Sequence, residues 1–269
     1  MIPIKTDEQI EKMRIAGRLT ANVLEAVSDF IKPGITTMQV DEFCERYIVD
    51  VLKAIPGSKG QYNYPYSVNT SLNHVICHGM PSVKQFLKEG DIVNVDVTVI
   101  YDGFYGDSSK MFCIGSTSLH AKRLVDVTQL CLYKGILEVK PNATTGDIGH
   151  AIQKHAEANH YSVVREYCGH GIGQKMHEEP QIEHYGKTGT GIVLQEGMIF
   201  TIEPMINQGK AEVKHIEKDG WPIAMTKDRM LSAQWEHTIL VTPTGFEVLT
   251  LREEEKAIFD AIIQTEPRP

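Results

Sequence analysis

Two aspartates lie close together in a segment that otherwise has the pattern of a buried β-strand. The stretch from residue 94 to residue 109, NVDVTVIYDGFYGDSS, carries Asp96 among alternating valines and Asp107 just past a Tyr-Asp-Gly turn. Burying a carboxylate costs free energy unless a partner offsets its charge. Two buried carboxylates also repel each other, and either a shared proton or a bound cation relieves that repulsion.

The length of the turn decides how the two aspartates face each other. If residues 102–103 form a two-residue turn, Asp96 lies opposite Ser109 and Asp107 is its diagonal neighbour. If the loop spans residues 100–103, Asp96 lies directly opposite Asp107. Both registers place the aspartates on one face, about 5 Å apart if opposite and roughly 7–8 Å if diagonal. A three-residue loop would turn one of the two side chains to the other face.

Three further side chains could complete a metal site. Glu203 in MIFTIEP and Glu236 in SAQWEHTILV both lie in apolar, strand-like segments, with Glu236 alternating with Gln234 and Thr238. His170 lies in CGHGIGQ, where glycines allow a close approach of the backbone. Four carboxylates and one imidazole suit ions such as Mn, Fe or Co better than they suit a metal that prefers thiolate ligands. Two cations that share these carboxylates would polarise a carbonyl and generate hydroxide from water.

Each of these residues also has an ordinary structural explanation. Asp96 could lie at an exposed strand edge, and Asp107 could belong to a turn or a helix cap. Glu203 could end a strand, Glu236 could face solvent, and His170 could be a loop histidine. The metal interpretation therefore needs evidence that links these positions to one another.

An internal repeat supplies that link. Residues 32–40, KPGITTMQV, match residues 140–148, KPNATTGDI, at an offset of 108 positions. The segment EGDIVNVD, which ends at Asp96, matches EGMIFTIE, which ends at Glu203, at an offset of 107 positions. Two matches at nearly the same offset indicate an ancient duplication, and they place a carboxylate at corresponding points of both copies.

The elements that must position these residues indicate an α+β protein. Thr6 and Gln9 form a capping box, and the periodicity that follows predicts a helix that continues to Lys32-Pro33-Gly34. We predict one catalytic domain over 1–269, with halves of about 1–116 and 117–252. The further expected elements are helices at 37–54, 119–138, 145–159 and 252–264, strands at 74–78, 91–99 and 104–114, an irregular segment at 56–70, strands and loops over 163–250, and a frayed tail TEPRP.

Composition narrows the functional classes. The chain has 269 residues, 42% of them hydrophobic and 23% charged, and a formal net charge of −8. This acidity argues against a general nucleic-acid binder or a binder of anionic membranes. The five cysteines include no C-x-x-C pair, which predicts a reducing compartment. We find neither a signal peptide nor a membrane-spanning run, so we expect a cytoplasmic protein with no membrane partner.

Two histidines stand apart from the ligand set. His78 lies in ICHGMP and His177 in KMHEEP, and each could be an ordinary loop histidine. Near two metal ions, a neutral imidazole could instead donate a hydrogen bond or shuttle a proton. His237, next to Glu236, should point to the opposite face of its strand.

At these motifs the sequence resembles the type I methionine aminopeptidases, from about Lys5 to Glu253. The motifs are NVDV, GDSS, GHGIG, TIEPM and SAQWEHT. The resemblance implies the pita-bread fold, in which two α+β halves related by a pseudo-two-fold axis pack around a bent antiparallel sheet flanked by helices. It favours the short bacterial form, because neither an N-terminal zinc-binding extension nor a long helical insertion is expected.

The resemblance also implies a dinuclear centre. Asp96, Asp107, His170, Glu203 and Glu236 would hold two divalent ions (Co, Mn, Fe or Zn), with Asp107 and Glu236 bridging them. Glu203 would also act as the acid/base. A bridging water or hydroxide would attack the first peptide carbonyl and release methionine from nascent polypeptides with a small second residue.

Further roles follow from the same resemblance. His78 would lie near the leaving amide nitrogen and His177 near the scissile carbonyl oxygen, so both would be catalytic and substrate-binding residues. The methionine pocket would include Tyr64, Trp221 and Met205, whereas Tyr64 and Trp221 taken alone would more often be ordinary aromatics. One monovalent cation, Na or K, would be held partly by the carbonyls of Asn73, Val75 and Ser232.

The sequence departs from several family members in the pocket. Asn69 stands where many members have cysteine, Met176 where phenylalanine is common, and Gln61 where some have tyrosine. These differences change the shape of the pocket but leave the chemistry alone.

Two rival interpretations remain. An aminopeptidase P or prolidase shares the fold but usually has a large extra N-terminal domain. A non-catalytic peptide-binding or RNA-binding module should have lost ligands, and all five are present here. We expect a monomer that meets nascent chains beginning with Met and the ribosome transiently, without sequence-specific nucleic-acid binding. Lysines at 210, 214, 218 and 227 could contact ribosomal RNA or simply belong to solvated loops.

Overall fold

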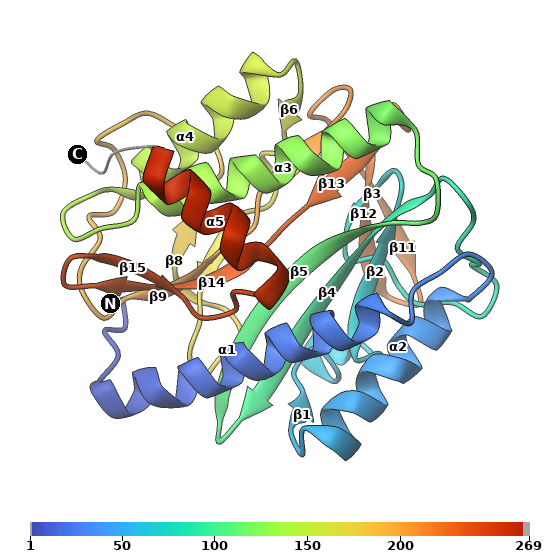
Figure 1. Cartoon of the computed structure of the whole chain (residues 1–269), viewed down its shortest axis with the longest axis horizontal. Helices are drawn as coiled ribbons and strands as arrows, with labels where there is room; N and C mark the ends of the chain where they lie inside the picture. The colour runs from blue at the N-terminus through green and yellow to red at the C-terminus, as the bar shows by residue number, and fades with distance from the viewer. Residues whose placement is uncertain (1, 266–269) are drawn as a thin grey trace.

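A long β-hairpin runs through the middle of the computed structural model (Figure 1). It consists of β4 (Ile92–Tyr101) and β5 (Phe104–Cys113), which pair along their whole length with Asp96 opposite Ser109. The turn residues Asp102 and Gly103 have φ angles of 47° and 79°, as the preferred two-residue hairpin turns require. The predicted two-residue register is therefore confirmed, and the four-residue alternative is wrong.

The structure describes residues 2–265, so the predicted frayed tail lies almost wholly outside the described residues. Within this range the chain forms five α-helices, none of them long and apolar enough to cross a bilayer. The helices are α1 (Asp7–Ser28), α2 (Thr37–Arg46), α3 (Leu119–Leu137), α4 (Thr145–Ala158) and α5 (Glu253–Thr265). The other strands are β1 (Ile55–Pro56), β2 (Val68–Leu72), β3 (Val75–Cys77), β6 (Ser162–Val163), β7 (Gly169–Gly171), β8 (Glu178–Ile182), β9 (Ile199–Ile202), β10 (Met205–Asn207), β11 (Val213–Lys218), β12 (Trp221–Thr226), β13 (Ser232–Gln234), β14 (His237–Thr242) and β15 (Gly245–Val248).

The strands form four antiparallel sheets, and the hairpin belongs to one of them. Strand β4 pairs with β5 and also with β1 and β2. A five-stranded sheet has the order β15-β14-β9-β7-β8, and two three-stranded sheets have the orders β13-β10-β6 and β11-β12-β3. Between β9 and β10, and again between β13 and β14, the chain leaves one sheet and enters another, and two residues of the site described below lie at these transitions.

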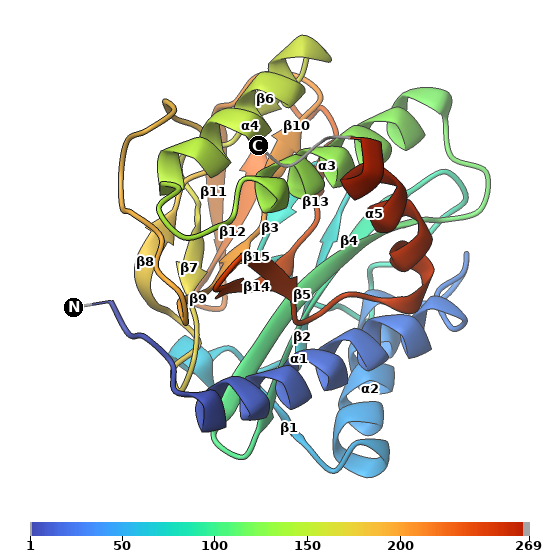
Figure 2. The same ribbon diagram turned by 60° about the vertical axis from the view of Figure 1, so that its left-hand side comes forward.

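The helices form two groups on the sheets. Figures 1 and 2 show α1 and α2 together, and α3, α4 and α5 together in a separate group. Helix α1 packs on β4 and β5, while α3 packs on β9, β10 and β13. At Gly106 in β5 an added Cβ would lie 2.6 Å from the Ala16 carbonyl carbon, so only glycine permits this close approach of α1.

Each helix group covers its own apolar core. One core contains buried residues between Val23 and Ile114 only, including the alternating valines of β4. The other contains residues between Ala121 and Phe259, with Ile92 and Met111 of the hairpin added. The hairpin therefore contributes side chains to both cores.

The repeat seen in the sequence has a structural counterpart. Thr36 and Thr144 each begin a helix with a capping box, at α2 and at α4. Each also forms an isolated β-bridge, Thr36 with Phe86 and Thr144 with Val193. Both bridges join residues 50 or 49 positions apart, so the two segments repeat the same local structure.

Three boundaries differ from the prediction. Helix α1 ends at Ser28, whose hydroxyl donates to the Leu24 carbonyl, and not at the later proline. The second helix changes to a π-helix over Tyr47–Val51, and Lys53, at φ 54°, ends it. The segment 56–70, expected to be irregular, ends in β2, whose polar residues form a strand because they pair with β4.

Candidate metal centre

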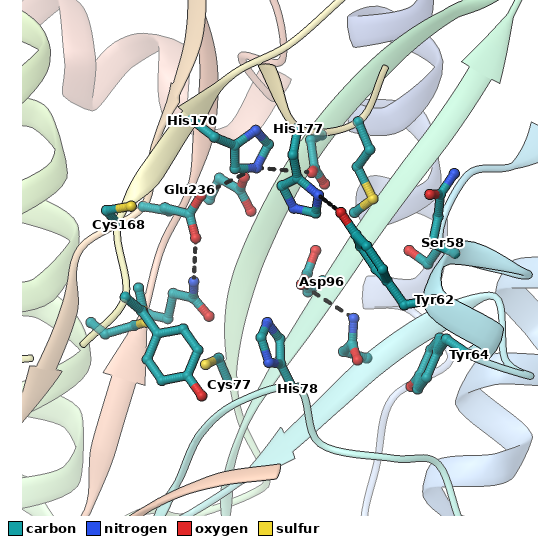
Figure 3. A pocket seen from close by; sticks show the side chains of 18 of the residues that line it. Ser58, Tyr62, Tyr64, Cys77, His78, Asp96, Cys168, His170, His177 and Glu236 are labelled. Carbon is teal, nitrogen blue, oxygen red and sulfur yellow. Dashed lines mark hydrogen bonds and ion pairs between the residues drawn. The ribbon is translucent and has the colours of Figure 1, made fainter. Parts of the chain in front are cut away.

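The five predicted ligands and both predicted catalytic histidines line one cavity of about 530 Å³. In Figure 3, His78, Asp96, His170 and His177 surround the same space. Asp96 lies on β4, Asp107 lies on β5, and His170 lies on β7. The fold therefore brings together residues that are distant in the sequence.

Both glutamates of the set lie at breaks between strands, and the expectation of continuous strands was wrong. Glu203 lies between β9 and β10, and Glu236 lies between β13 and β14. At both points the chain crosses between the five-stranded sheet and the sheet β13-β10-β6. A strand cannot keep its ladder of hydrogen bonds while it changes sheets, so the backbone is interrupted there. His237 points away from the cavity, as predicted, and its Nδ1 lies 2.9 Å from Thr250 Oγ1.

The two aspartates are oriented by polar neighbours across the hairpin and across β2. Thr98 lies opposite Asp107, and its hydroxyl donates to Asp107 Oδ1 over 2.9 Å. Asn69 lies opposite Asp96, and its Nδ2 donates to Asp96 Oδ2 over 3.4 Å. Asn69 thus supplies an amide donor where a cysteine would supply a thiol.

His170 has the geometry of a metal ligand. Its Nδ1 lies 3.0 Å from the Gly171 carbonyl oxygen, which can only accept, so this nitrogen carries the proton. Its Nε2 is therefore free to donate a lone pair, and it lies 3.5 Å from Glu203 Oε1 and 3.8 Å from Asp107 Oδ2. Ligand atoms of Asp107, His170 and Glu236 all lie within 4.8 Å of one another.

The cavity gathers four carboxyl groups whose ionisation is unfavourable there. Burial raises the pKa of Asp96 to about 7. Burial, followed by the charges of neighbouring carboxylates, raises the pKa values of Asp107 and Glu236 well above their ordinary range. Burial also raises the pKa of Glu203 well above its ordinary range.

The imidazole at the centre cannot balance this charge. Burial and then the charge at His177 lower the pKa of His170 to about 3, so His170 stays neutral. No lysine or arginine occurs among the described residues that line the cavity. An oxygen-rich set of buried carboxylates with one neutral imidazole fits divalent cations.

The two other predicted histidines lie at the wall of the cavity. Burial lowers the pKa of His78 to about 4, and the Trp221 indole N–H donates to the His78 carbonyl over 2.9 Å. The ring of His177 lies 4.3 Å from that of His170. The hydroxyl of Tyr62 lies 3.3 Å from His177 Nδ1, a contact shown in Figure 3.

The expected substrate pocket is part of the same cavity. Tyr64 and Trp221 lie with ring centroids 4.3 Å apart, and Met205 is buried nearby. All three positions that depart from the family, Gln61, Asn69 and Met176, line the cavity.

The predicted monovalent-cation residues lie outside this cavity. Ser232 donates its backbone N–H to the Asn73 carbonyl over 2.9 Å, which brings two of the three residues into contact. Val75 lies on β3 and pairs with Met225 on β12. Their carbonyl ligation remains a prediction.

Sequence reasoning missed several supporting side chains. Thr201 donates to Glu203 Oε1 over 2.8 Å, and Gln234 donates to Glu203 Oε2 over 3.2 Å. The alternation of Gln234 with Glu236 was a usable signal. Tyr62 gave no signal, because its role depends on contact with His177 in a remote part of the chain.

Comparison with known proteins identifies the family. The model of metallopeptidase family M24 matches residues 11–243. The chain belongs to metallopeptidase family M24. This M24 enzyme is 54% identical to a methionine aminopeptidase of Escherichia coli (strain K12), over 94% of this chain and 96% of that protein. The resemblance inferred from the motifs is therefore confirmed.

Solved structures confirm the predicted pita-bread fold of this M24 enzyme. The crystal structure of methionine aminopeptidase from Rickettsia prowazekii superposes with a TM-score of 0.91 at 49% identity, covering 93% of this chain and 100% of that chain. The prolidase from Pyrococcus horikoshii OT3 superposes with a TM-score of 0.72 at 22% identity, covering 93% of this chain and 64% of that chain. The second likeness shows a shared fold alone.

Proposed function

We propose that this M24 enzyme is a dinuclear metallo-aminopeptidase that removes N-terminal methionine from peptides with a small second residue. The observation that carries the proposal is the cavity in which two buried carboxylates, two partly buried ones and the neutral His170 meet without a cationic side chain. The identity to proteins named methionine aminopeptidase supports methionine as the residue removed.

Two divalent ions (Co, Mn, Fe or Zn) would be held by Asp96, Asp107, His170, Glu203 and Glu236, with Asp107 and Glu236 shared between them. When bound, such ions polarise the scissile carbonyl and provide hydroxide at neutral pH. Every other step depends on the side chains of the chain itself.

Three residues would handle the substrate and its protons. Tyr62 occupies His177 Nδ1, which leaves His177 Nε2 free to donate to the scissile carbonyl oxygen. Nδ1 of His78 is buried without a hydrogen-bond partner, so it is available to the leaving amide nitrogen. Glu203, held through both carboxylate oxygens, would transfer a proton to that nitrogen as acid/base.

The cavity also accounts for removal of a single residue. An N-terminal amine is cationic and would be attracted by the acidic end of the cavity. The methionine side chain would lie against Tyr64, Trp221 and Met205, which form an apolar, largely aromatic wall. A bulky second residue would clash at the mouth of the cavity.

The remaining features belong to the same proposal. The catalytic domain spans 1–269, with related halves of about 1–116 and 117–252, and the separate apolar cores support this division. The enzyme would be a cytoplasmic monomer that meets nascent chains transiently at the ribosome. One Na or K ion would bind near Asn73, Val75 and Ser232.

The test is hydrolysis by metal-free protein to which single metals are added back. Met-Ala-Ser should be cleaved once Mn or Co is added, Met-Leu-Ser should be cleaved poorly, and X-Pro peptides should resist. The Asp107→Ala variant should lose almost all activity. Cleavage of X-Pro peptides alone, or full activity of Asp107→Ala, would refute the proposal.

A further inference from the structure

The strand breaks at the two glutamates leave backbone groups without ladder partners. Glu203 and Glu236 each lie between two strands that belong to different sheets. A buried backbone group without a partner costs free energy, so another donor or acceptor is needed at each break. The Glu236 N–H donates to the Ser109 carbonyl over 3.2 Å, whereas a buried side chain supplies the partner of the Glu236 carbonyl and of the Glu203 N–H.

At Glu236 the partner is a serine. Ser108 Oγ donates to the Glu236 carbonyl oxygen over 2.6 Å. Arg252 Nη1 in turn donates to Ser108 Oγ over 2.9 Å. A hydroxyl has one proton, and because Arg252 can only donate, the serine proton must point to the carbonyl of Glu236.

Arg252 is held in place by partners behind the centre. Its side chain is fully buried, and its Nε lies 2.7 Å from Glu255 Oε2 on α5. The Tyr133 hydroxyl donates to Glu255 Oε1 over 2.7 Å, and the Arg252 guanidinium lies 5.5 Å from the Trp235 ring. A buried ion pair is weak evidence for stability by itself, because desolvation offsets much of its attraction.

At Glu203 the partner is a histidine. The Glu203 backbone N–H donates to His184 Nε2 over 3.1 Å. His184 is fully buried, and because its Nε2 accepts, its proton must lie on Nδ1, which has no hydrogen-bond partner. A buried N–H group without a partner costs free energy, so an apolar residue would suit this position better if packing were its only role.

We infer that Ser108, oriented by Arg252, and His184 are positioning residues that fix the two glutamates at the spacing which two cations require. None of the three lines the cavity. Ser108 and His184 act through the backbone of Glu236 and Glu203, and Arg252 acts on Glu236 through Ser108 and through its own charge. The inference rests on the proposed function. Outer partners of metal ligands typically change metal affinity 10–100-fold when they are removed.

The first test measures Mn²⁺ binding to metal-free protein by calorimetry, beside kcat and KM for Met-Ala-Ser. Ser108→Ala should bind Mn²⁺ at least about tenfold more weakly, and kcat should fall with KM nearly unchanged. Arg252→Met should weaken Mn²⁺ binding and lower kcat as Ser108→Ala does. The double variant should lose no more Mn²⁺ affinity than the more severely affected single variant, because the two residues act in series. Arg252→Lys should recover part of the loss.

The second test concerns His184. His184→Leu should weaken Mn²⁺ binding, whereas His184→Gln, whose side-chain oxygen can accept from the Glu203 N–H, should recover much of it. The matched control is Thr128→Val, which removes a buried hydroxyl bonded over 2.7 Å to the Leu124 carbonyl within α3. That variant should lose some stability and bind Mn²⁺ like the wild type.

The outcomes distinguish a failure of the positioning role from a failure of the proposed function. Folded Ser108→Ala and His184→Leu proteins with wild-type Mn²⁺ affinity and kcat would overturn the inference, even if Arg252→Met failed to fold. If Ser108→Ala and His184→Leu changed Mn²⁺ affinity and kcat no more than Thr128→Val does, the inference would be overturned as well. A wild-type protein that neither bound Mn²⁺ nor cleaved Met-Ala-Ser would instead refute the proposed function.

Discussion

At the scale of single residues, the centre is a set of acidic side chains that destabilise one another in the absence of a cation. Asp107 is almost fully buried, and burial followed by the charge of Asp96 raises its pKa well above its ordinary range. A raised carboxyl pKa means that the folded state prefers the protonated form. Its contribution to stability is therefore present at low pH and is lost as the pH rises through the folded pKa.

Asp107→Asn should consequently stabilise the metal-free protein at pH 8 and abolish its stabilisation by Mn²⁺. The amide keeps an oxygen that can accept from Thr98 but removes a buried charge. Thermal unfolding in EDTA at pH 5 and pH 8 measures the effect, which should be larger at pH 8. Asp126→Asn, an exposed change on α3, should leave both melting temperatures unchanged. A lower melting temperature of metal-free Asp107→Asn at pH 8 would contradict this view of the centre.

Tyr62→Phe should reduce kcat for Met-Ala-Ser about fivefold, because one hydrogen bond of about 1 kcal/mol no longer holds the ring of His177. Mn²⁺ affinity should be unchanged. Steady-state kinetics with Tyr101→Phe, on the exposed end of β4, provides the comparison. An unchanged kcat would show that the tyrosine hydroxyl does not orient His177.

At the scale of elements, the structures that depend on neighbouring residues could be predicted from the sequence. Those that depend on pairing with remote segments could not. The capping box of Thr6 and Gln9 follows from neighbouring residues and was predicted correctly. The two-residue turn at Asp102 was one of the two loop lengths that the sequence left open. Strand β2 was missed because its polar sequence becomes a strand only by pairing with β4. The break at Glu236 was missed because it depends on which sheets the flanking strands join.

Helix α2 holds the start of β2 through one buried carboxylate. Asp41 Oδ1 accepts from the backbone N–H groups of Ser67 and Val68 over 2.8 and 3.0 Å. Burial raises the pKa of Asp41 to about 6. The segment that follows α2 and contains Tyr64 of the cavity wall is thereby tied to the helix.

Asp41→Asn should make the protein more stable relative to the wild type as the pH rises from 4 to 8. The wild type loses the contribution of this group as the pH passes through about 6, because the buried carboxyl must ionise. The gain should be at most roughly 3 kcal/mol, since one pKa unit corresponds to about 1.4 kcal/mol. Urea unfolding at several pH values measures it, with the exposed Asp50→Asn as the control. A difference that does not change with pH would mean that Asp41 is ionised at no cost.

At the scale of the whole molecule, the centre joins parts that are far apart along the chain. Asp96 and Asp107 come from the central hairpin, whereas His170, Glu203 and Glu236 come from strands and breaks much later in the sequence. The ligand types could be predicted from motifs and from the repeat. The residues that hold the two glutamates in place could not be predicted, because Ser108 and His184 acquire their roles only when remote segments meet.

Metal should therefore bind the folded chain and not the unfolded one, and the melting temperature should rise with metal concentration. At a concentration about 100 times Kd, the free energy of unfolding should increase by about 2.7 kcal/mol per site. Calorimetric melting with Mn²⁺, and its reversal by EDTA, measures the effect. Asp107→Ala should show a much smaller rise, and an equal rise in that variant would place the bound metal elsewhere.

Arg252 and Glu255 follow the last strand, and Glu255 lies on the last described helix. This segment comes later in the chain than every residue that lines the cavity. A chain cut before α5 would keep all five candidate ligands and lose the Glu255 carboxylate that holds Arg252 behind Glu236.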